Sequence, residues 1–228
     1  MAGGKRATRI IIGLALGTAL AASVAVWAFT TGFAYYVLPP GLSGEGERLA
    51  ALLELRPGLT VAEIGAGRGA LTVDLARRVG PGGRVYSTEL DPDRRAAIER
   101  RADGARLRNV TVVKAAEAAT NLPDACCAAV VMRNVYHHVD ERSAFTASLR
   151  RAVADGGLLA VIDFEPGALH HVGCGRGADA GGPGAHGVWR RDLVAEAARA
   201  GFVVQREIPR WGGGMYLVLF RTGPAGTR

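Results

Sequence analysis

The sequence has little cysteine, almost no lysine and no internal repeat. Two of its three cysteines, Cys126 and Cys127, are neighbours, so the cysteines define no disulfide framework. Lys5 and Lys114 are the only lysines, so the formal net charge of +7 comes almost entirely from arginine. The arginines are spread along the chain without interleaved aromatic residues that could stack on bases, which argues against nucleic acid as a partner.

The composition fits one ordinary domain with an appendage. The chain has 228 residues, of which 49% are hydrophobic and 21% are charged, and this balance does not suggest wholesale disorder. The sequence gives no indication of an oligomeric state.

Charged residues are absent from 10–38, a run longer than the roughly 20 residues that cross a bilayer as a helix. A basic flank, 1–9, precedes the run, and aromatic residues gather toward its far end as in an interfacial belt. We therefore expect a single-pass membrane anchor. A cleaved signal peptide ending near Ala21 is the alternative.

The side of the membrane on which the domain lies is left open by the sequence. The basic flank favours an N-terminus inside the cell and a domain on the far side. A cofactor made inside the cell would require the opposite orientation.

Short apolar runs alternate with helical patterns through 45–222, as in a doubly wound α/β fold. A linker at 39–44 precedes this domain, and 223–228 form a tail. We expect strands at 61–64, 85–89, 110–113, 129–132 and 158–163, helices at 45–55, 68–79, 92–102, 140–154 and 189–200, and a final hairpin of 202–207 with 215–221.

The segment from Thr60 to Leu71 predicts a nucleoside-binding turn between a strand and a helix. Glycines here let the backbone pass close to a ligand, because a Cβ atom would collide with it. Glu89 ends the next predicted strand, near the spacing of about 20 residues at which a carboxylate binds ribose hydroxyls. The glycines alone also fit the dinucleotide pattern G-x-G-x-x-G/A.

Glu63 and a third glycine, Gly69, extend the motif to E-x-G-x-G-x-G, which resembles the first motif of class I S-adenosylmethionine-dependent methyltransferases. The resemblance implies a Rossmann-like seven-stranded sheet with a reversed edge strand, preceded here by the transmembrane helix. It also implies that S-adenosylmethionine is the cofactor and that Glu63 helps to hold its amino group. The cofactor-binding residues expected on this basis are Glu63, Gly65, Ala66, Gly67, Gly69, Glu89, Leu90, Glu117 and Arg133.

Two stretches depart from the family pattern. The usual G-D-A-E after the third strand is Lys114-Ala115-Ala116-Glu117 here, so the aspartate position is alanine and Glu117 is the available carboxylate near the adenine. The usual F-D-x-V of the fourth strand is Cys127-Ala128-Ala129-Val130. These losses concern cofactor binding and leave the fold expectation unchanged.

The fourth strand should deliver 133–138 to the edge of the sheet where the resemblance puts the transferred methyl group. We expect His137 to be the base or substrate contact and Tyr136 to be a wall or hydrogen-bond donor. The alternative for either histidine is a satisfied core position. The glycine-rich stretch 166–187 contains His170, His171, Cys174 and His186 without the paired spacing of a known metal site, so we expect a lid and no metal.

These features together predict a membrane-anchored methyltransferase that acts on a small-molecule or lipid-like acceptor. One alternative is an NAD(P)-dependent oxidoreductase, although the chain has no suitably spaced tyrosine-lysine pair as proton donor. The other is a non-catalytic membrane-tethered protein derived from a methyltransferase, which the missing aspartate and the uncertain orientation favour.

Overall fold

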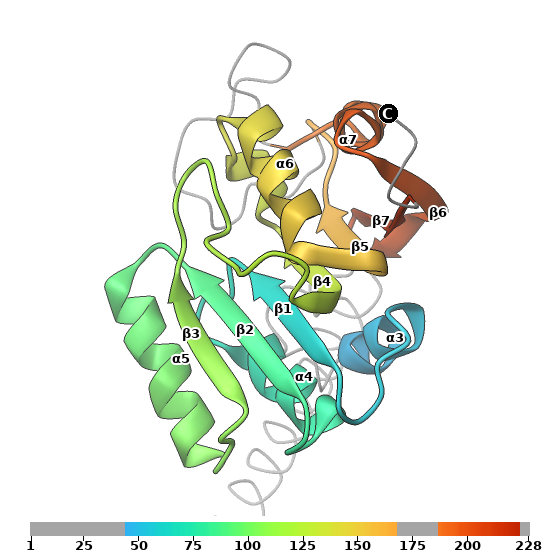
Figure 1. The fold of residues 1–228 in the computed structure, drawn as a ribbon. Helices are drawn as coiled ribbons and strands as arrows, with labels where there is room; N and C mark the ends of the chain where they lie inside the picture. Colours follow the sequence, from blue (N-terminus) through green and yellow to red (C-terminus); the bar gives the residue numbers. More distant parts are fainter. Residues whose placement is uncertain (1–43, 168–186, 224–228) are drawn as a thin grey trace, which may run out of the picture.

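The computed structural model describes residues 44–167 and 187–223, which form one seven-stranded sheet with helices on both faces (Figure 1). The strands lie in the order β3-β2-β1-β4-β5-β7-β6. Their bounds are β1 Thr60–Ile64, β2 Arg84–Glu89, β3 Val110–Lys114, β4 Cys127–Arg133, β5 Val153–Asp163, β6 Phe202–Gly212 and β7 Met215–Thr222. The helices are α3 Glu45–Leu52, α4 Ala70–Val79, α5 Pro92–Gly104, α6 Arg142–Ala152 and α7 Arg190–Arg199, with a 3-10 turn, η1, at Tyr136–His138.

The expected membrane segment, 10–38, lies outside the described residues. Within 44–167 and 187–223, no helix is both long enough and apolar enough to span a bilayer.

Strands β1 to β5 run parallel and form the predicted α/β core. β1 pairs with β2 and β4, β2 with β3, and β4 with β5, all in parallel register. The middle strands β1, β4 and β5 are largely buried, as expected for short apolar strands covered on both faces.

The reversed strand is present but does not lie at the edge. β7 runs antiparallel to both β5 and β6 and lies between them, so the edge strand is β6. The burial patterns explain this order. β7 is apolar and buried along nearly its whole length and needs a neighbour on each side, whereas β6 exposes many of its residues.

Two helical layers cover the sheet. One apolar cluster joins α3 and α4 to one face through side chains such as Leu49, Leu75 and Val131. The other joins α6 and α7 to the opposite face through Leu149 and Leu193. The layers leave the carboxyl ends of the parallel strands free to carry a site.

Several local boundaries differ from the sequence prediction. Asp91 caps α5 as typical N-caps do, accepting hydrogen bonds from the backbone of Asp93 and Arg94. However, α6 ends at Ala152, two residues before the predicted end of this helix, and β5 begins directly at Val153. Cys126 and Cys127 form a disulfide between neighbours, which links no separate segments.

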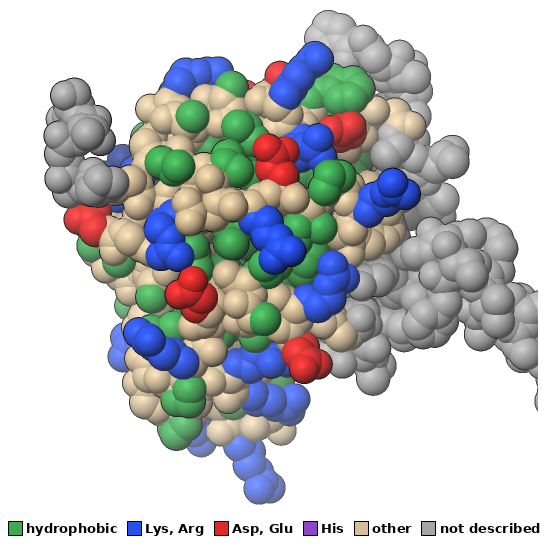
Figure 2. All heavy atoms as spheres, turned by 90° about the vertical axis from the view of Figure 1, so that its right-hand side faces the viewer, with side chains coloured by type: hydrophobic (Ala, Val, Ile, Leu, Met, Phe, Trp, Pro, Cys, Tyr) green, Lys and Arg blue, Asp and Glu red, His purple; other side chains and the backbone are tan. Residues whose placement is uncertain are grey.

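The surface beside α3 and β6 carries both signs of charge. Figure 2 shows basic side chains scattered over this face among acidic and apolar side chains. On the face shown, the basic residues therefore do not gather into one stripe of the kind that follows a nucleic-acid backbone.

Candidate active site

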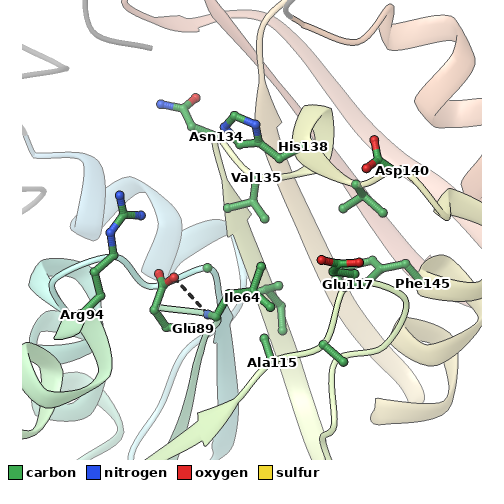
Figure 3. A pocket seen from close by; sticks show the side chains of 14 residues that line it. Ile64, Glu89, Arg94, Ala115, Glu117, Asn134, Val135, His138, Asp140 and Phe145 are labelled. Atoms are coloured by element: carbon green, nitrogen blue, oxygen red, sulfur yellow. Dashed lines mark hydrogen bonds between the residues drawn. The ribbon is translucent and has the colours of Figure 1, made fainter. Parts of the chain in front are cut away.

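A cavity of about 490 Å³ opens at the carboxyl ends of β1, β2 and β4. The chain order of the strands reverses between β1 and β4, which is the place where open α/β sheets bind ligands. The residues that line the cavity are Ile64, Gly65, Glu89, Leu90, Arg94, Ala115, Ala116, Glu117, Asn134, Val135, His138, Val139, Asp140 and Phe145 (Figure 3).

The predicted glycine turn forms the edge of the cavity nearest β1. Gly65, Gly67 and Gly69 have φ values of 67°, 57° and 76°, a region that side chains rarely adopt. A Cβ atom on Gly65 would also collide with the side chain of Val135. The loop therefore needs glycine both for its conformation and for its close approach to the 134–135 segment.

Glu89 presents its carboxylate to the same cavity. Its Oε2 accepts a hydrogen bond from the backbone N–H of Gly67 at 2.8 Å. Its Oε1 accepts from the backbone N–H groups of Leu90 and Asp91 at 3.0 and 3.2 Å. The end of β2 is thereby fixed against the glycine loop, with the carboxylate placed where ribose hydroxyls bind in this type of fold.

Glu63 lies under the loop and not among the cavity-lining residues. Thr72 donates a hydrogen bond to its Oε2 at 2.5 Å, and the hydroxyls of Thr72 and Ser87 are 2.8 Å apart. Burial is the main cause that raises the pKa of Glu63 to about 8, although the Thr72 hydrogen bond and the charge of Arg133 both lower it. Its expected contact with the cofactor amino group stays a prediction.

The residues expected at the adenine end do reach the cavity. Leu90 is half exposed beside Glu89, and Glu117 points into the cavity from the opposite side (Figure 3). Ala115 and Ala116 complete this wall. An apolar side chain with a carboxylate across from it fits a flat base that carries an amino group.

Tyr136 lies outside the lining of the cavity, in the core. It is 1% exposed, and its hydroxyl donates to Glu196 Oε2 at 2.6 Å and lies 3.1 Å from the hydroxyl of Thr146. Burial and the Glu196 hydrogen bond raise the pKa of Tyr136 far above its usual range. The expected role of Tyr136 as a cavity wall therefore does not match its position.

His137 also lies outside the lining, and its neighbour His138 is inside it. The Nδ1 atom of His137 is 2.7 Å from Asp163 Oδ1, and its ring packs against those of His138 and Phe164. The 3-10 turn explains why His138 and not His137 lines the cavity, because three residues per turn send three successive side chains in different directions. The histidine doublet was a visible signal, but the sequence did not show which member faces the ligand.

Arg133 is held outside the cavity lining by a carboxylate. Its Nε lies 3.0 and 2.9 Å from the two carboxylate oxygens of Glu45, which is fully buried. Gly67, Gly69 and Ala66 shape the loop without appearing among the cavity-lining residues. Sequence reasoning missed the lining residues Arg94 and Asp140. Asn134, Val135 and His138 belong to the predicted segment 133–138 but were not singled out as site residues.

A search of the described ranges, 44–167 and 187–223, finds no group of three His, Cys, Asp or Glu residues that could hold a metal. The histidines and the cysteine of the expected lid, at 170, 171, 174 and 186, lie outside these ranges.

Comparison with known proteins identifies the domain around this cavity. Residues 62–161 match the family model of a methyltransferase domain. The chain is 42% identical over 62 residues to a protein-L-isoaspartate O-methyltransferase of Methanothrix thermoacetophila, a match that covers 27% of this chain and 30% of that protein. It is 32% identical over 118 residues to a ubiquinone/menaquinone biosynthesis C-methyltransferase of Bordetella avium, covering 49% of this chain and 43% of that protein. The chain thus spans less than half the length of either relative.

A solved structure gives the same result for the fold. The crystal structure of a SAM-dependent methyltransferase from Aquifex aeolicus superposes with a TM-score of 0.66 at 23% identity, over 78% of this chain and 90% of that one. Residues 62–161 therefore match a methyltransferase domain, and the chain shares the fold of a SAM-dependent methyltransferase.

Proposed function

We propose that the protein transfers a methyl group from S-adenosylmethionine to a small-molecule or lipid-like acceptor. The observation that carries this proposal is the Glu89 carboxylate, held against the Gly67 N–H at the edge of the cavity where the strand order reverses. The glycine spacing alone also fits a dinucleotide, and the E-x-G-x-G-x-G pattern completed by Glu63 and Gly69 favours a nucleoside with a short charged tail.

The residues present fit the bound cofactor. Glu89 would accept hydrogen bonds from the ribose hydroxyls, while Leu90 and Glu117 would contact the adenine. The positive-φ turn at Gly65 and Gly67 leaves no side chain between the backbone and the methionine half. When bound, the cofactor supplies an activated methyl group on sulfur.

The remaining lining residues would orient the acceptor. Asn134 and His138 reach the cavity from the segment that follows β4. Methyl transfer is an in-line displacement, so most of the acceleration can come from alignment of the nucleophile with the methyl carbon. His138 is the group placed to take a proton if the acceptor must lose one.

The small-molecule acceptor and the anchor belong to the same proposal. Support for the acceptor comes from the relative named as a ubiquinone/menaquinone biosynthesis C-methyltransferase, and support for the anchor comes from the uncharged run 10–38. A single-pass membrane protein whose domain begins at Glu45 would have access to acceptors dissolved in the bilayer. Carbonate extraction of membranes tests the anchor, because a spanning chain stays in the pellet.

Titration calorimetry on the purified full-length chain tests the cofactor. We expect heat of binding with S-adenosylmethionine and S-adenosylhomocysteine and none with NAD. Binding of NAD alone would replace the proposal with an oxidoreductase. Binding of the sulfur nucleosides without methyl transfer to any membrane extract or small-molecule panel would favour the non-catalytic alternative.

A further inference from the structure

Four residues from remote parts of the chain form a network around the buried side chains of Glu45 and Trp211. Glu45 and Arg48 come from α3, Arg133 from the end of β4, and Trp211 from β6. The carboxylate of Glu45 is fully buried and binds Arg133, and the indole N–H of Trp211 donates to the same carboxylate at 2.8 Å.

Arg48 closes the network from the other side. Its guanidinium stacks on the Trp211 ring, 3.8 Å from the ring centroid, and donates to the Trp211 carbonyl at 2.9 Å. A buried carboxylate is stable only when its charge and its lone pairs have partners. Glu45 meets this requirement with Arg133 and Trp211, so the position of each partner is fixed by the other.

Arg133 is the residue through which this network can influence the cavity. Asn134 follows it directly, lines the cavity and has a φ of 55°, which costs a non-glycine residue about 1 kcal/mol or more. The backbone N–H of Asn134 donates to the carbonyl of Ile162 at 2.8 Å, which holds this turn to β5. A second restraint on this turn comes from α3. Glu45 of that helix binds the side chain of Arg133, which directly precedes the turn.

The next residue brings the network to the glycine loop. Val135 lines the cavity and packs so closely on Gly65 that a Cβ atom there would collide with it. A shift of Arg133 would therefore move Asn134 and Val135 against the glycine loop. The geometry points to Glu45 and Trp211 as positioning residues of the cofactor site, which act through Arg133 and do not touch the cofactor. This inference rests on the proposed function.

A double-mutant cycle on the full-length chain tests the inference, with S-adenosylhomocysteine as the titrated probe. Glu45→Gln keeps an acceptor for Trp211 but removes the charge that holds Arg133. We expect it to weaken binding about tenfold, because the 134–135 segment loses its restraint. Arg133→Gln should weaken binding at least as much, and the double variant should be no weaker than Arg133→Gln alone.

Two further variants separate positioning from general stability. Trp211→Phe removes the indole N–H donor together with part of the ring on which Arg48 stacks, and should weaken binding about threefold. This variant covers the case in which Glu45→Gln does not fold. Glu54→Gln is the matched control, because Glu54 pairs with Arg221 at the exposed surface, 3.2 Å away. It should bind as the wild type does, and thermal melts would establish that each variant is folded at the titration temperature.

The possible outcomes are distinct. Wild-type affinity in folded Glu45→Gln and Trp211→Phe would overturn the inference, as would a double variant whose loss is the product of the two single losses. Absence of binding in the wild type would instead contradict the proposed function.

Discussion

Glu63 and Glu89 lie on opposite sides of the same glycine loop and are almost equally buried, with 5% and 6% exposure. Glu89 accepts three backbone hydrogen bonds, including one from Gly67, and faces the cavity. Glu63 has a hydroxyl donor, Thr72, and lies beneath the loop. Burial is the main cause that raises the pKa of Glu63 to about 8, against the lowering effect of the hydrogen bonds from Thr72.

The comparison teaches that the surroundings of a carboxylate, and not its distance from a motif, decide its role. Backbone N–H groups favour the charged form, which accepts hydrogen bonds from a ligand. A neutral carboxyl under the loop instead ties the start of α4 to β1 and β2 through Thr72 and Ser87. Changes to each carboxylate and its neighbours test this division.

The stability difference between wild type and Glu63→Gln should depend strongly on pH. The folded protein keeps a proton on Glu63 that the unfolded chain releases, since the pKa rises from 4.5 to about 8 on folding. Stability conferred by this proton is complete at low pH and is lost as the pH rises through that window. Relative to the glutamine variant, the wild type should lose about 5 kcal/mol, since each pKa unit is worth about 1.4 kcal/mol. Urea unfolding of both proteins between pH 4.5 and about 8 measures this difference. A difference in the free energy of unfolding that does not change with pH would contradict the prediction.

Gly65→Ala should destabilise the protein by about 3 kcal/mol and abolish binding of S-adenosylhomocysteine. The added methyl group combines a left-handed conformation with a collision against Val135. Gly67→Ala is the matched control, because it has a similar φ of 57° but open space at the Cβ position. It should cost only about 1 to 2 kcal/mol. Equal losses in chemical denaturation would show that the Val135 contact is unimportant.

Tyr136→Phe should lower stability by about 1.5 kcal/mol without changing cofactor affinity. The variant removes the hydroxyl that donates to the Glu196 carboxylate inside the core. Thermal melts and calorimetric titration measure the two effects separately. Loss of cofactor affinity at unchanged stability would show instead that Tyr136 is part of the wall of the cofactor site.

Glu117→Gln should weaken binding of S-adenosylhomocysteine by about 1 kcal/mol, which is roughly fivefold. Glu117 faces the cavity opposite Glu89 and is the carboxylate available to the adenine amino group (Figure 3). Inosine-based analogues, which lack that amino group, should bind both proteins equally. If the variant binds the analogue more weakly than the wild type does, the result would be inconsistent with this contact.

The sequence predicted those parts of the site that are built from neighbouring residues. The glycine turn, Glu89 and Leu90 follow from strand and helix patterns within one βαβ unit, and they lie where the pattern requires. The sheet with its helical layers follows from the same alternation.

The remaining parts depend on contacts between distant residues. The Glu45–Arg133 and Glu45–Trp211 pairs join positions 88 and 166 residues apart, which no periodicity reveals. The inner position of β7 depends on how much of each strand is buried against its neighbours. The 3-10 turn sends His138 to the cavity, and its backbone conformation leaves no pattern in the sequence.

The most direct test of the account compares Glu89→Gln and Glu63→Gln in one set of calorimetric titrations with S-adenosylhomocysteine at neutral pH. Glu89→Gln should weaken binding by about 1.5 to 3 kcal/mol, because the charged acceptor for the ribose hydroxyls is lost. Glu63→Gln replaces a carboxyl that is already neutral and lies outside the cavity lining, so its affinity should stay within about threefold of the wild type, below 1 kcal/mol. Equal losses in the two variants, or a loss confined to Glu63→Gln, would contradict the assignment of cofactor binding to Glu89 and of loop support to Glu63.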